Sequence, residues 1–287
     1  MEQPNISTPS FIFVDGSYFI FYRYYALCTW WRNAHATELD VLNDPVSNDI
    51  FVDKFTTTFI DKFAEIPKKI GYSTNDNPVI IVGKDCKRKH IWRYNLFPKY
   101  KLQRATKTED GFMGGPFFKM AYECEELFRQ AGASKILSHP HLEADDCIAL
   151  TTKHLLEKYP NCHIDIITSD KDYLQLLEPR VQLYNLGFKK LSEQKSYTGD
   201  PQCDLFCKIV SGDMSDNIPS VFPRCGMKTA LKYFKCPEQF EKKLLESEEF
   251  RTQYQLNKTI IDFNNIPQSL QDEFMTNQSY YLEQLHE

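Results

Sequence analysis

The sequence has no apolar run that approaches the roughly 18 consecutive residues of a membrane-spanning helix. Its first ten residues, MEQPNISTPS, lack the charged start and the apolar stretch of a signal peptide. Internal repeats and low-complexity tracts are also missing. We therefore expect a soluble, intracellular protein with no membrane partner. Its 287 residues, 42% of them hydrophobic, are enough for one large globular domain or for one domain with a small helical unit.

Cys-x-x-Cys pairs are absent as well, although the chain contains nine cysteines. An odd number of scattered cysteines does not favour a disulfide framework, and the missing pairs do not favour a zinc knuckle. The nearest approach to a ligand pair is Cys203 and Cys207 in the stretch CDLFC, one helical turn apart. We expect reduced thiols, and we expect these two side chains to pack in the interior.

The formal net charge is −5, which by itself argues against a polyanionic partner. One part of the chain departs from this average. Residues 84–107, KDCKRKHIWRYNLFPKYKLQRATK, contain nine Lys or Arg and one Asp, and we call them the basic segment. Aromatic residues lie between the cations, a combination that holds phosphates and stacks on bases. A charged run is also typical of a solvated surface, so the segment suggests nucleic-acid binding only together with other features.

Three short runs rich in Ile, Val and Phe end at acidic residues, as buried parallel strands do when their carboxyl ends carry the chemistry. They cover residues 11–16, 78–85 and 163–172. Helical periodicity occurs between them, at residues 17–31, 49–66 and 144–159. Strand and helix alternate, which indicates a doubly wound α/β sheet. After residue 200 helical patterns dominate, and the glycine-rich stretch 105–120 is expected to be a loop.

Acidic residues concentrate at the ends of the expected strands, at the start of an expected helix and in a later loop. A single carboxylate in such a position is often a helix cap or a turn residue. Nine occur here: Asp15, Asp85, Glu143, Asp145, Asp146, Asp170, Asp172, Asp213 and Asp216. Because the carboxyl ends of strands in an open α/β sheet converge on one crevice, we expect these acids to lie together. Their mutual repulsion would destabilise the fold unless cations lay among them.

The composition of this acidic set predicts the kind of cation. Oxygen ligands without His or Cys favour Mg²⁺, with Mn²⁺ as a substitute, over zinc. One Mg²⁺ usually binds only one or two carboxylates, so nine acids favour two ions. A pair of such ions can activate a water molecule as nucleophile and stabilise the leaving oxygen during hydrolysis of a phosphodiester. The acids would hold the metals while the basic segment holds the nucleic acid.

Five blocks of the sequence resemble, in order, the 5′-nucleases, which are related to the flap endonucleases. The blocks are FVDGSYFIFYRYYAL, WRYNLFPKYKLQR, LEADD, TSDKDYLQLL, and GDMSDNIPSV followed by GMKTA. The resemblance covers residues 11–235 and is greatest to phage 5′-exonucleases and to the 5′-nuclease domain of bacterial DNA polymerase I. It implies a PIN-like α/β fold, with a mostly parallel central sheet flanked by helices.

The same resemblance implies a division of the chain. Residues 1–200 would form the metal-dependent nuclease domain, with a helical arch at about 93–130. Residues 201–287 would form a helical DNA-binding subdomain, with a helix-three-turn-helix at about 205–235 and further helices behind it.

The resemblance also assigns roles to single residues. It implies one metal site formed by Asp15, Asp85, Glu143, Asp145 and Asp146, and a second formed by Asp170, Asp172, Asp213 and Asp216. Lys101 and Arg104 are expected near the scissile phosphate, where they would stabilise developing negative charge. A solvated cation at the first position and a salt-bridge partner at the second remain open alternatives. Contacts to DNA are implied for Arg93, Tyr100, Gly226, Lys228 and Thr229.

Two of these DNA contacts carry alternatives or departures. Tyr100 either stacks on a base or is a core aromatic residue whose hydroxyl points outward. In the family's helix-three-turn-helix, a Gly-x-Gly turn presents main-chain groups to phosphate or to a monovalent cation such as K⁺. Here the turn reads VFPRCGMKTA, with Arg224 near the position of the first glycine. Gly226 and Lys228 match the family pattern, so duplex binding is still implied.

Three functions remain in competition. The first is a monomeric, Mg²⁺-dependent 5′–3′ exonuclease and flap endonuclease that cuts branched or 5′-ended DNA in replication or repair. The second is a PIN-like endoribonuclease, against which the blocks GDMSDNIP and GMKTA argue because such domains lack the helix-three-turn-helix. The third is a catalytically silent binder of DNA junctions, which would be expected to have lost acids that this chain retains.

Overall fold

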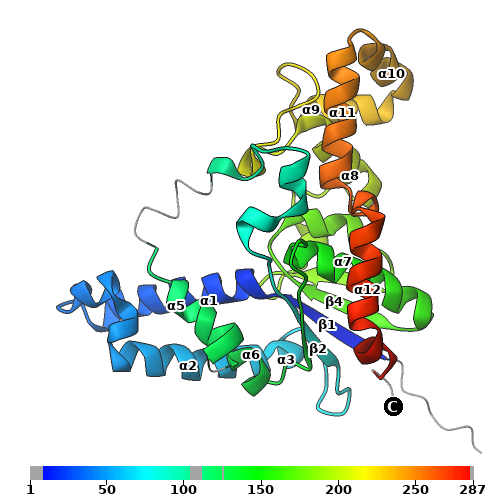
Figure 1. Ribbon diagram of the computed structural model, residues 1–287. Coiled ribbons are helices and arrows are strands. Elements are labelled where there is room, and N and C mark those ends of the chain that lie inside the picture. The colour runs from blue at the N-terminus through cyan, green and yellow to red at the C-terminus, as the bar shows by residue number, and fades with distance from the viewer. Residues whose placement is uncertain (1–8, 104–111, 125, 285–287) are drawn as a thin grey trace, which may run out of the picture.

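The computed structural model describes residues 9–103, 112–124 and 126–284. Its centre is a sheet of five parallel strands in the order β3-β2-β1-β4-β5 (Figure 1). The strands are β1 (Ser10–Asp15), β2 (Val79–Gly83), β3 (Lys135–Leu137), β4 (His163–Ile167) and β5 (Val181–Tyr184). The predicted α/β class and the parallel sheet are confirmed. The three expected strands correspond to β1, β2 and β4, whereas β3 and β5 were not predicted.

The register of the strands brings their carboxyl ends to one edge of the sheet. β1 lies between β2 and β4, with Asp15 paired with Gly83 and Val14 paired with Ile167. The direction in which the sheet is built reverses at β1, because β2 and β3 lie on one side and β4 and β5 on the other. Such a switch point is where open α/β sheets form their crevice.

Helices cover both faces of the sheet, and alternate residues of β1 point into the two resulting cores. Ile12 and Val14 belong to the core on one face, and Phe11 and Phe13 to the core on the other. The first face is covered by α1 (Gly16–Ala34), α2 (Asp49–Ala64), α3 (Ile66–Lys69), α5 (Gly115–Lys119), the π-helical η5 (Met120–Cys124) and α6 (Leu127–Gln130). The second is covered by α7 (Ala144–Lys158) and α12 (Gln268–Glu283).

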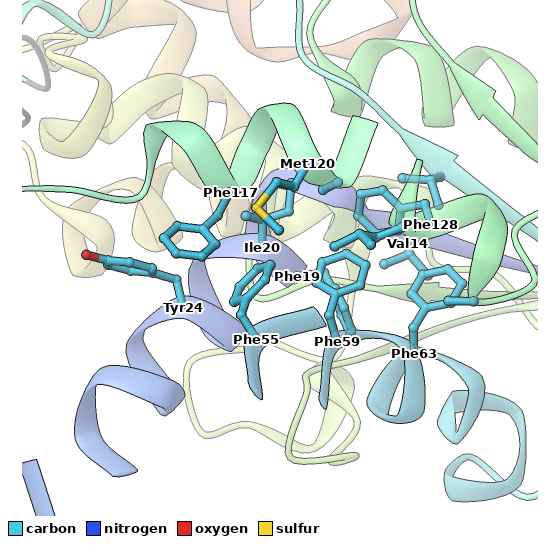
Figure 2. Close-up of a cluster of buried hydrophobic side chains, with 14 of the residues drawn as sticks. Val14, Phe19, Ile20, Tyr24, Phe55, Phe59, Phe63, Phe117, Met120 and Phe128 are labelled. Carbon is cyan, nitrogen blue, oxygen red and sulfur yellow. The ribbon is translucent and has the colours of Figure 1, made fainter. Parts of the chain in front are cut away.

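Aromatic packing fixes α1 against the sheet (Figure 2). Every fourth residue of α2 is a phenylalanine, so that one stripe of the helix is apolar and fully buried. The ring centroid of Phe19 in α1 lies 4.9 Å from that of Phe59 in an edge-to-face arrangement. Truncating such a ring to alanine typically costs about 3–5 kcal/mol. This packing holds the first turn of α1, and with it Asp15, in place.

From residue 201 to residue 284 the described chain contains helices and no strand. The α-helices are α8 (Pro201–Ser211), α9 (Met227–Lys235), α10 (Pro237–Leu245), α11 (Glu248–Ile261) and α12. Cys203 and Cys207 pack with Phe222 in a small separate core, so their predicted packing role is confirmed. Figure 1 shows α9, α10 and α11 beyond the sheet, while α12 lies beside α7. The division into two domains at residue 200 stays a prediction.

The stretch that was expected to be a loop, 105–120, differs from the prediction. It is helical from Gly115 onward, because Pro116 occupies the first turn of α5, where a missing N–H is tolerated. Residues 104–111 lie outside the described residues, so the predicted arch at 93–130 is described only in part. No helix in the described part of the chain combines the length and the apolar character that a membrane crossing requires.

Candidate active site

Two of the predicted acids end strands at the switch point and begin helices. Asp15 ends β1, and its carboxylate accepts the N–H of Tyr18 at 3.0 Å in the first turn of α1. Asp170 follows β4, and its carboxylate accepts the N–H of Asp172 at 3.0 Å at the start of η6 (Lys171–Leu176). Each carboxylate is therefore oriented by the backbone that follows it.

Three further acids occupy the start of α7. Glu143 is the N-cap residue and Asp145 and Asp146 lie in the first turn, where the positive end of the helix dipole favours carboxylates. The carboxylate of Asp146 accepts the backbone N–H of Glu143 at 3.1 Å, as in a capping box. The block LEADD is thus at once a helix start and a cluster of negative charge.

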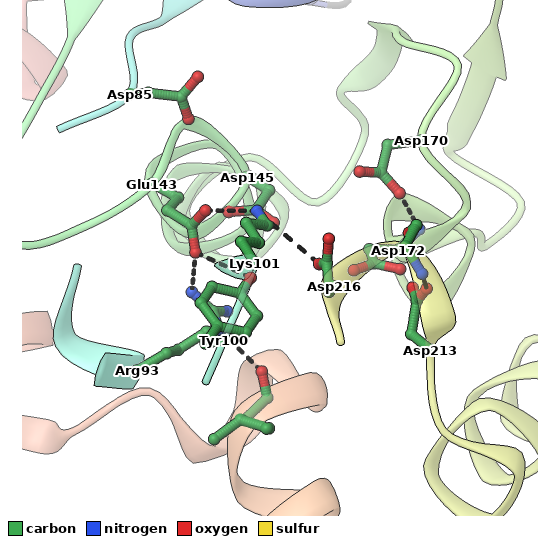
Figure 3. A network of polar contacts seen from close by, with 12 residues as sticks. Asp85, Arg93, Tyr100, Lys101, Glu143, Asp145, Asp170, Asp172, Asp213 and Asp216 are labelled. Carbon is green, nitrogen blue, oxygen red and sulfur yellow. Dashed lines mark hydrogen bonds and ion pairs between the residues drawn. The ribbon is translucent and has the colours of Figure 1, made fainter. Parts of the chain in front are cut away.

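Within the described residues, two sets of carboxylates have oxygens that all lie within 4.8 Å of one another (Figure 3). The first acid group consists of Glu143, Asp145 and Asp146. The second acid group consists of Asp172, Asp213 and Asp216. The three remaining predicted ligands, Asp15, Asp85 and Asp170, do not belong to either group.

Electrostatic coupling nevertheless links Asp15 to its neighbours. Burial, followed by the negative charge of Asp85, raises the pKa of Asp15 to about 7. Burial and the charges of Asp146 and Glu143 raise the pKa of Asp145 well above its usual range. These two carboxyl groups therefore ionise reluctantly unless further positive charge approaches them.

Asp85 is the predicted ligand nearest to the loop after β2, and both of its oxygens have partners. One accepts the hydroxyl of Ser17 at 2.5 Å, and the other accepts the backbone N–H of Ala144 at 2.9 Å. These contacts join the ends of β1 and β2 to the start of α7. Asp85, which follows β2, therefore connects this strand to α1 and to α7.

Arg93 was predicted to contact DNA, but the structure places it in the protein interior. It is 2% exposed, and its guanidinium contacts Glu143 at 2.9 Å and Asp146 at 2.7 and 2.8 Å. Its Nε donates to the carbonyl of Ile260 at 2.7 Å, and Trp92 Nε1 donates to Asp146 at 2.9 Å. Both oxygens of Asp146, which is 0% exposed, are therefore occupied by protein donors. Arg93 is a buried counter-ion of the first acid group, since two buried carboxylates require a charged partner.

Lys101 lies between the two acid groups (Figure 3). Its Nζ is 2.5 Å from an oxygen of Glu143 and 3.8 Å from an oxygen of Asp216. Burial alone would lower the pKa of Lys101, but Glu143, Tyr100 and Asp216 raise it well above its usual range. The ammonium thus faces carboxylates of both acid groups, and its role at the scissile phosphate stays a prediction.

Tyr100 was expected to stack on a base or to pack in the core, and the structure shows the second arrangement. Only 3% of the residue is exposed, and its ring belongs to a small core with Ile91 and Ile209. The hydroxyl does not point outward, because it donates to Glu143 at 3.1 Å. Arg104, the other predicted catalytic cation, lies outside the described residues.

The second acid group contains a cation that the sequence had not suggested. Lys208 of α8 contacts Asp172, and its Nζ is 2.9 Å from an oxygen of Asp213. Burial alone would raise the pKa of Asp213, but Lys208 and Ser215 lower it to about 2. Asp213 is therefore a firmly ionised carboxylate. The only signal for Lys208 in the sequence was its position on the predicted helix, shortly before the block GDMSD.

The predicted helix-three-turn-helix corresponds to α8, an irregular segment and α9. Gly226 is the N-cap residue of α9, and Lys228 and Thr229 are exposed in its first turn. Arg224 has a φ of 57°, the left-handed conformation in which glycine is the usual residue. Although the turn lacks the first glycine of Gly-x-Gly, the backbone of Arg224 thus adopts the conformation that a glycine would adopt there. The contacts of this turn with DNA and with K⁺ stay predictions.

Residues 10–202 match the family model described as 5′-3′ exonuclease, N-terminal resolvase-like domain. The chain belongs to this 5′-3′ exonuclease family. A 5′-3′ exonuclease of Buchnera aphidicola is 29% identical over 225 residues, which are 77% of this chain and 68% of the relative. Ribonuclease H of Enterobacteria phage T4 is 27% identical over 219 residues, which are 71% of this chain and 68% of the relative. DNA polymerase I of Treponema pallidum is 32% identical, but over 50% of this chain and 14% of the polymerase.

Solved structures of T5 nucleases have this fold. A T5 flap endonuclease in a pseudo-enzyme–product complex with DNA and metal ions superposes with a TM-score of 0.65 at 18% identity, covering 96% of this chain and all of that one. A T5 5′-exonuclease with bound divalent zinc gives 0.63 at 17% identity, covering 95% and 99% of the two chains. The predicted relation to phage 5′-exonucleases and to the polymerase I nuclease domain is confirmed.

The acidic residues of this member of the 5′-3′ exonuclease family fit divalent cations. Both acid groups offer only carboxylate oxygens, the donor type that Mg²⁺ and Mn²⁺ prefer. In the described part of the chain, the buried hydroxyl of Tyr173 has no hydrogen-bond partner. It lies close enough to Asp15, Asp145 and Asp170 for their charges to raise its pKa, together with burial, well above its usual range. An orphaned donor beside a cluster of acids is what a metal site with its water ligands would satisfy.

Proposed function

We propose that this protein is a structure-specific 5′-nuclease that hydrolyses phosphodiester bonds of DNA at 5′ ends and 5′ flaps. Two divalent ions would assist, with Mg²⁺ as the natural ion and Mn²⁺ as a substitute. The observation that carries the proposal is the pair of acid groups at the switch-point edge, with Lys101 in contact with both. Membership in a family of 5′-3′ exonucleases supports the reaction class.

The two ions would be held by different sets of side chains. Glu143 and Asp145 would serve one ion with help from Asp15, and the second acid group would serve the other with help from Asp170. When bound, such ions lower the pKa of a nucleophilic water and stabilise negative charge on the leaving oxygen. T5 neighbours that were crystallised with metal ions support divalent cations as the occupants of this site.

Two of the predicted metal ligands would orient other parts of the site and would not bind a metal ion directly. Asp146 would orient Arg93 and the start of α7, because all its oxygen contacts are to protein donors. Asp85 would hold Ser17 and the N–H of Ala144, and so fix the spacing between β1 and α7. Both carboxylates also add to the negative charge of the site, Asp146 within the first acid group and Asp85 through its effect on Asp15.

Cationic side chains of the protein would bind the phosphates of the DNA. Lys101, and Arg104 in the adjoining segment, would approach the scissile phosphate and stabilise the charge that develops on it. Gly226, Lys228 and Thr229 would bind the duplex backbone at the start of α9, with a monovalent cation such as K⁺ at the turn. The T5 neighbour that was crystallised with DNA supports DNA as the substrate. We propose a monomer that works in replication or repair.

A second substrate is favoured by one observation: a relative that covers 71% of this chain is a ribonuclease H. The proposed reaction would be unchanged, but the cut strand would be RNA in a hybrid duplex. The deciding assay is cleavage of a labelled 5′-flap DNA, an RNA–DNA hybrid and single-stranded RNA, each with Mg²⁺ and with EDTA. Flap cutting that EDTA abolishes supports the proposal. Cutting of single-stranded RNA alone supports the PIN-like endoribonuclease, and binding without any cutting supports the silent junction binder.

Asp170→Ala provides the matched test of the site. We expect loss of cleavage with DNA binding largely retained, since the change removes a carboxylate and leaves the cationic contacts in place. Because Asp170 also caps η6, a stability loss of about 1 kcal/mol is expected in addition. Asp61→Ala, an exposed carboxylate on α2, is the control and should cut like the wild type. Normal cleavage by folded Asp170→Ala would remove this residue from the site.

A further inference from the structure

Lys208 was not among the predicted site residues, but in the structure it contacts two of them directly. It lies in the last turn of α8, contacts Asp172, and has its Nζ 2.9 Å from an oxygen of Asp213. Side chains of all three residues are at most 20% exposed, so bulk water screens the contact only in part. An ammonium therefore lies among the oxygens of the second acid group.

Lys208 reduces the negative charge of the second acid group. Three carboxylates carry −3 when all are ionised, and the ammonium of Lys208 offsets one of these charges at Asp172 and Asp213. The first acid group is different, because the guanidinium of buried Arg93 contacts Asp146 and Glu143. Lys208, by contrast, approaches the second group from the cavity described next.

A cavity of about 1100 Å³ opens beside the second acid group. Its lining includes Asp172, Asp213 and Lys208, together with the side chains of Lys171, Lys195, Lys228 and Lys235. The flexible stem of Lys208 can therefore swing from the carboxylates into a space that other cations already line. In that space the ammonium would face a phosphate of bound DNA instead of a carboxylate.

We propose that Lys208 is the resident counter-ion of the second acid group: in the metal-free protein its ammonium occupies the place of a divalent ion among the Asp172 and Asp213 oxygens. Ion and ammonium then compete, so that Lys208 sets the affinity for the second metal and is released toward the cavity when the metal binds. This inference rests on the proposed function, because it requires a metal at that group. It makes Lys208 a positioning residue whose effect is on metal binding.

The test is a calorimetric titration of the full chain with Mn²⁺ in the absence of DNA. We expect Lys208→Met and Lys208→Gln to bind the weaker of two ions at least 10-fold more tightly than the wild type. Lys208→Arg keeps the charge and should stay within about 3-fold of the wild type. Lys235→Met removes a charge from the same cavity without touching a carboxylate, and its affinity should likewise stay close to that of the wild type.

Melting curves with and without Mn²⁺ provide a second readout and show that each variant is folded. Metal-free Lys208→Met should melt below the wild type, because it leaves carboxylates unpaired, and saturating Mn²⁺ should remove that difference. Unchanged or weaker Mn²⁺ binding by folded Lys208→Met and Lys208→Gln would overturn the proposal while leaving the nuclease assignment intact. A wild-type protein that binds no divalent ion would overturn both.

Discussion

Replacing Arg93 distinguishes the position found for this residue from the DNA contact that the sequence predicted. Arg93→Met keeps most of the side-chain volume but removes four hydrogen bonds, of 2.9, 2.8 and 2.7 Å to Glu143 and Asp146 and of 2.7 Å to the carbonyl of Ile260. Breaking a buried pair by removing one partner usually costs about 3–5 kcal/mol, because the other charge is left uncompensated. Asp146 is 0% exposed, so we expect a loss in this range.

Such a loss is large for a protein whose total stability is of the order of 5–15 kcal/mol. It can be measured by urea unfolding at pH 7, followed by circular dichroism. Arg93→Lys retains the charge without the planar fork and should lose less than Arg93→Met. Adding Asp146→Leu to Arg93→Met removes the unpaired carboxylate and should recover part of the stability. Glu143 keeps a cation in either variant, because Lys101 remains 2.5 Å away.

The same variant separates the two roles by a second measurement. If Arg93 is structural, the folded fraction of Arg93→Met should bind a flap DNA within a few-fold of the wild type at fixed salt, as measured by fluorescence anisotropy. A stability loss below about 1 kcal/mol, together with a DNA affinity that falls 10-fold or more, would refute the buried counter-ion and restore the predicted DNA contact.

Three further outcomes are expected. Lys101→Ala should lower the rate of flap cleavage by at most about 10²–10³-fold, as one electrostatic contact to a transition state is worth ~3–4 kcal/mol, and an unchanged single-turnover rate would remove it from the reaction. Phe59→Ala should lower the free energy of unfolding by about 3–5 kcal/mol in urea titrations, since a fully buried ring is lost; a change below 1 kcal/mol would contradict the packing of α1 on α2. The hydrogen bond that His163 donates to the carboxylate of Asp165 raises the pKa of His163, so the contribution of this pair to stability should be complete below about pH 6.5 and decrease as the pH rises through the raised pKa. His163→Asn should abolish this decrease, and an identical pH profile for both proteins would exclude the pair as its cause.

The parts of the fold that the sequence predicted correctly are those with strong local patterns. β1 and β2 are apolar runs with buried interiors, and β4, which reads HIDII, is rich in Ile although it also buries Asp165. Such buried runs indicate central parallel strands. β3 has only three residues, and β5 alternates between buried and half-buried positions, so neither forms a continuous apolar run. The helix after Gly115 was missed because glycines and a proline indicate a loop unless the proline opens a helix.

The site was predictable to the extent that acids at strand ends must converge on one edge. Which cations meet them was not predictable, because that depends on contacts between distant residues. Arg93 is 50 residues from Glu143 in the sequence, and nothing in the basic segment separates it from the exposed Lys87 and Lys89. Lys208 stands on a helix whose orientation is set by the packing of Cys207 and Val210, not by its charges.

These cations change the answer to the electrostatic problem that the sequence posed. Repulsion among the acids seemed to require divalent ions for folding itself, but Arg93, Lys101 and Lys208 already supply positive charge to both groups. Burial alone would raise the pKa of Glu143, yet Lys101 and Arg93 lower it, so this carboxylate is ionised without metal. At Asp15 and Asp145, burial and the neighbouring carboxylates outweigh these cations, so the pKa values of both groups are raised. The remaining need for positive charge is therefore concentrated on the side of the site where Asp15 and Asp145 lie, and this is where metal binding should depend most steeply on pH.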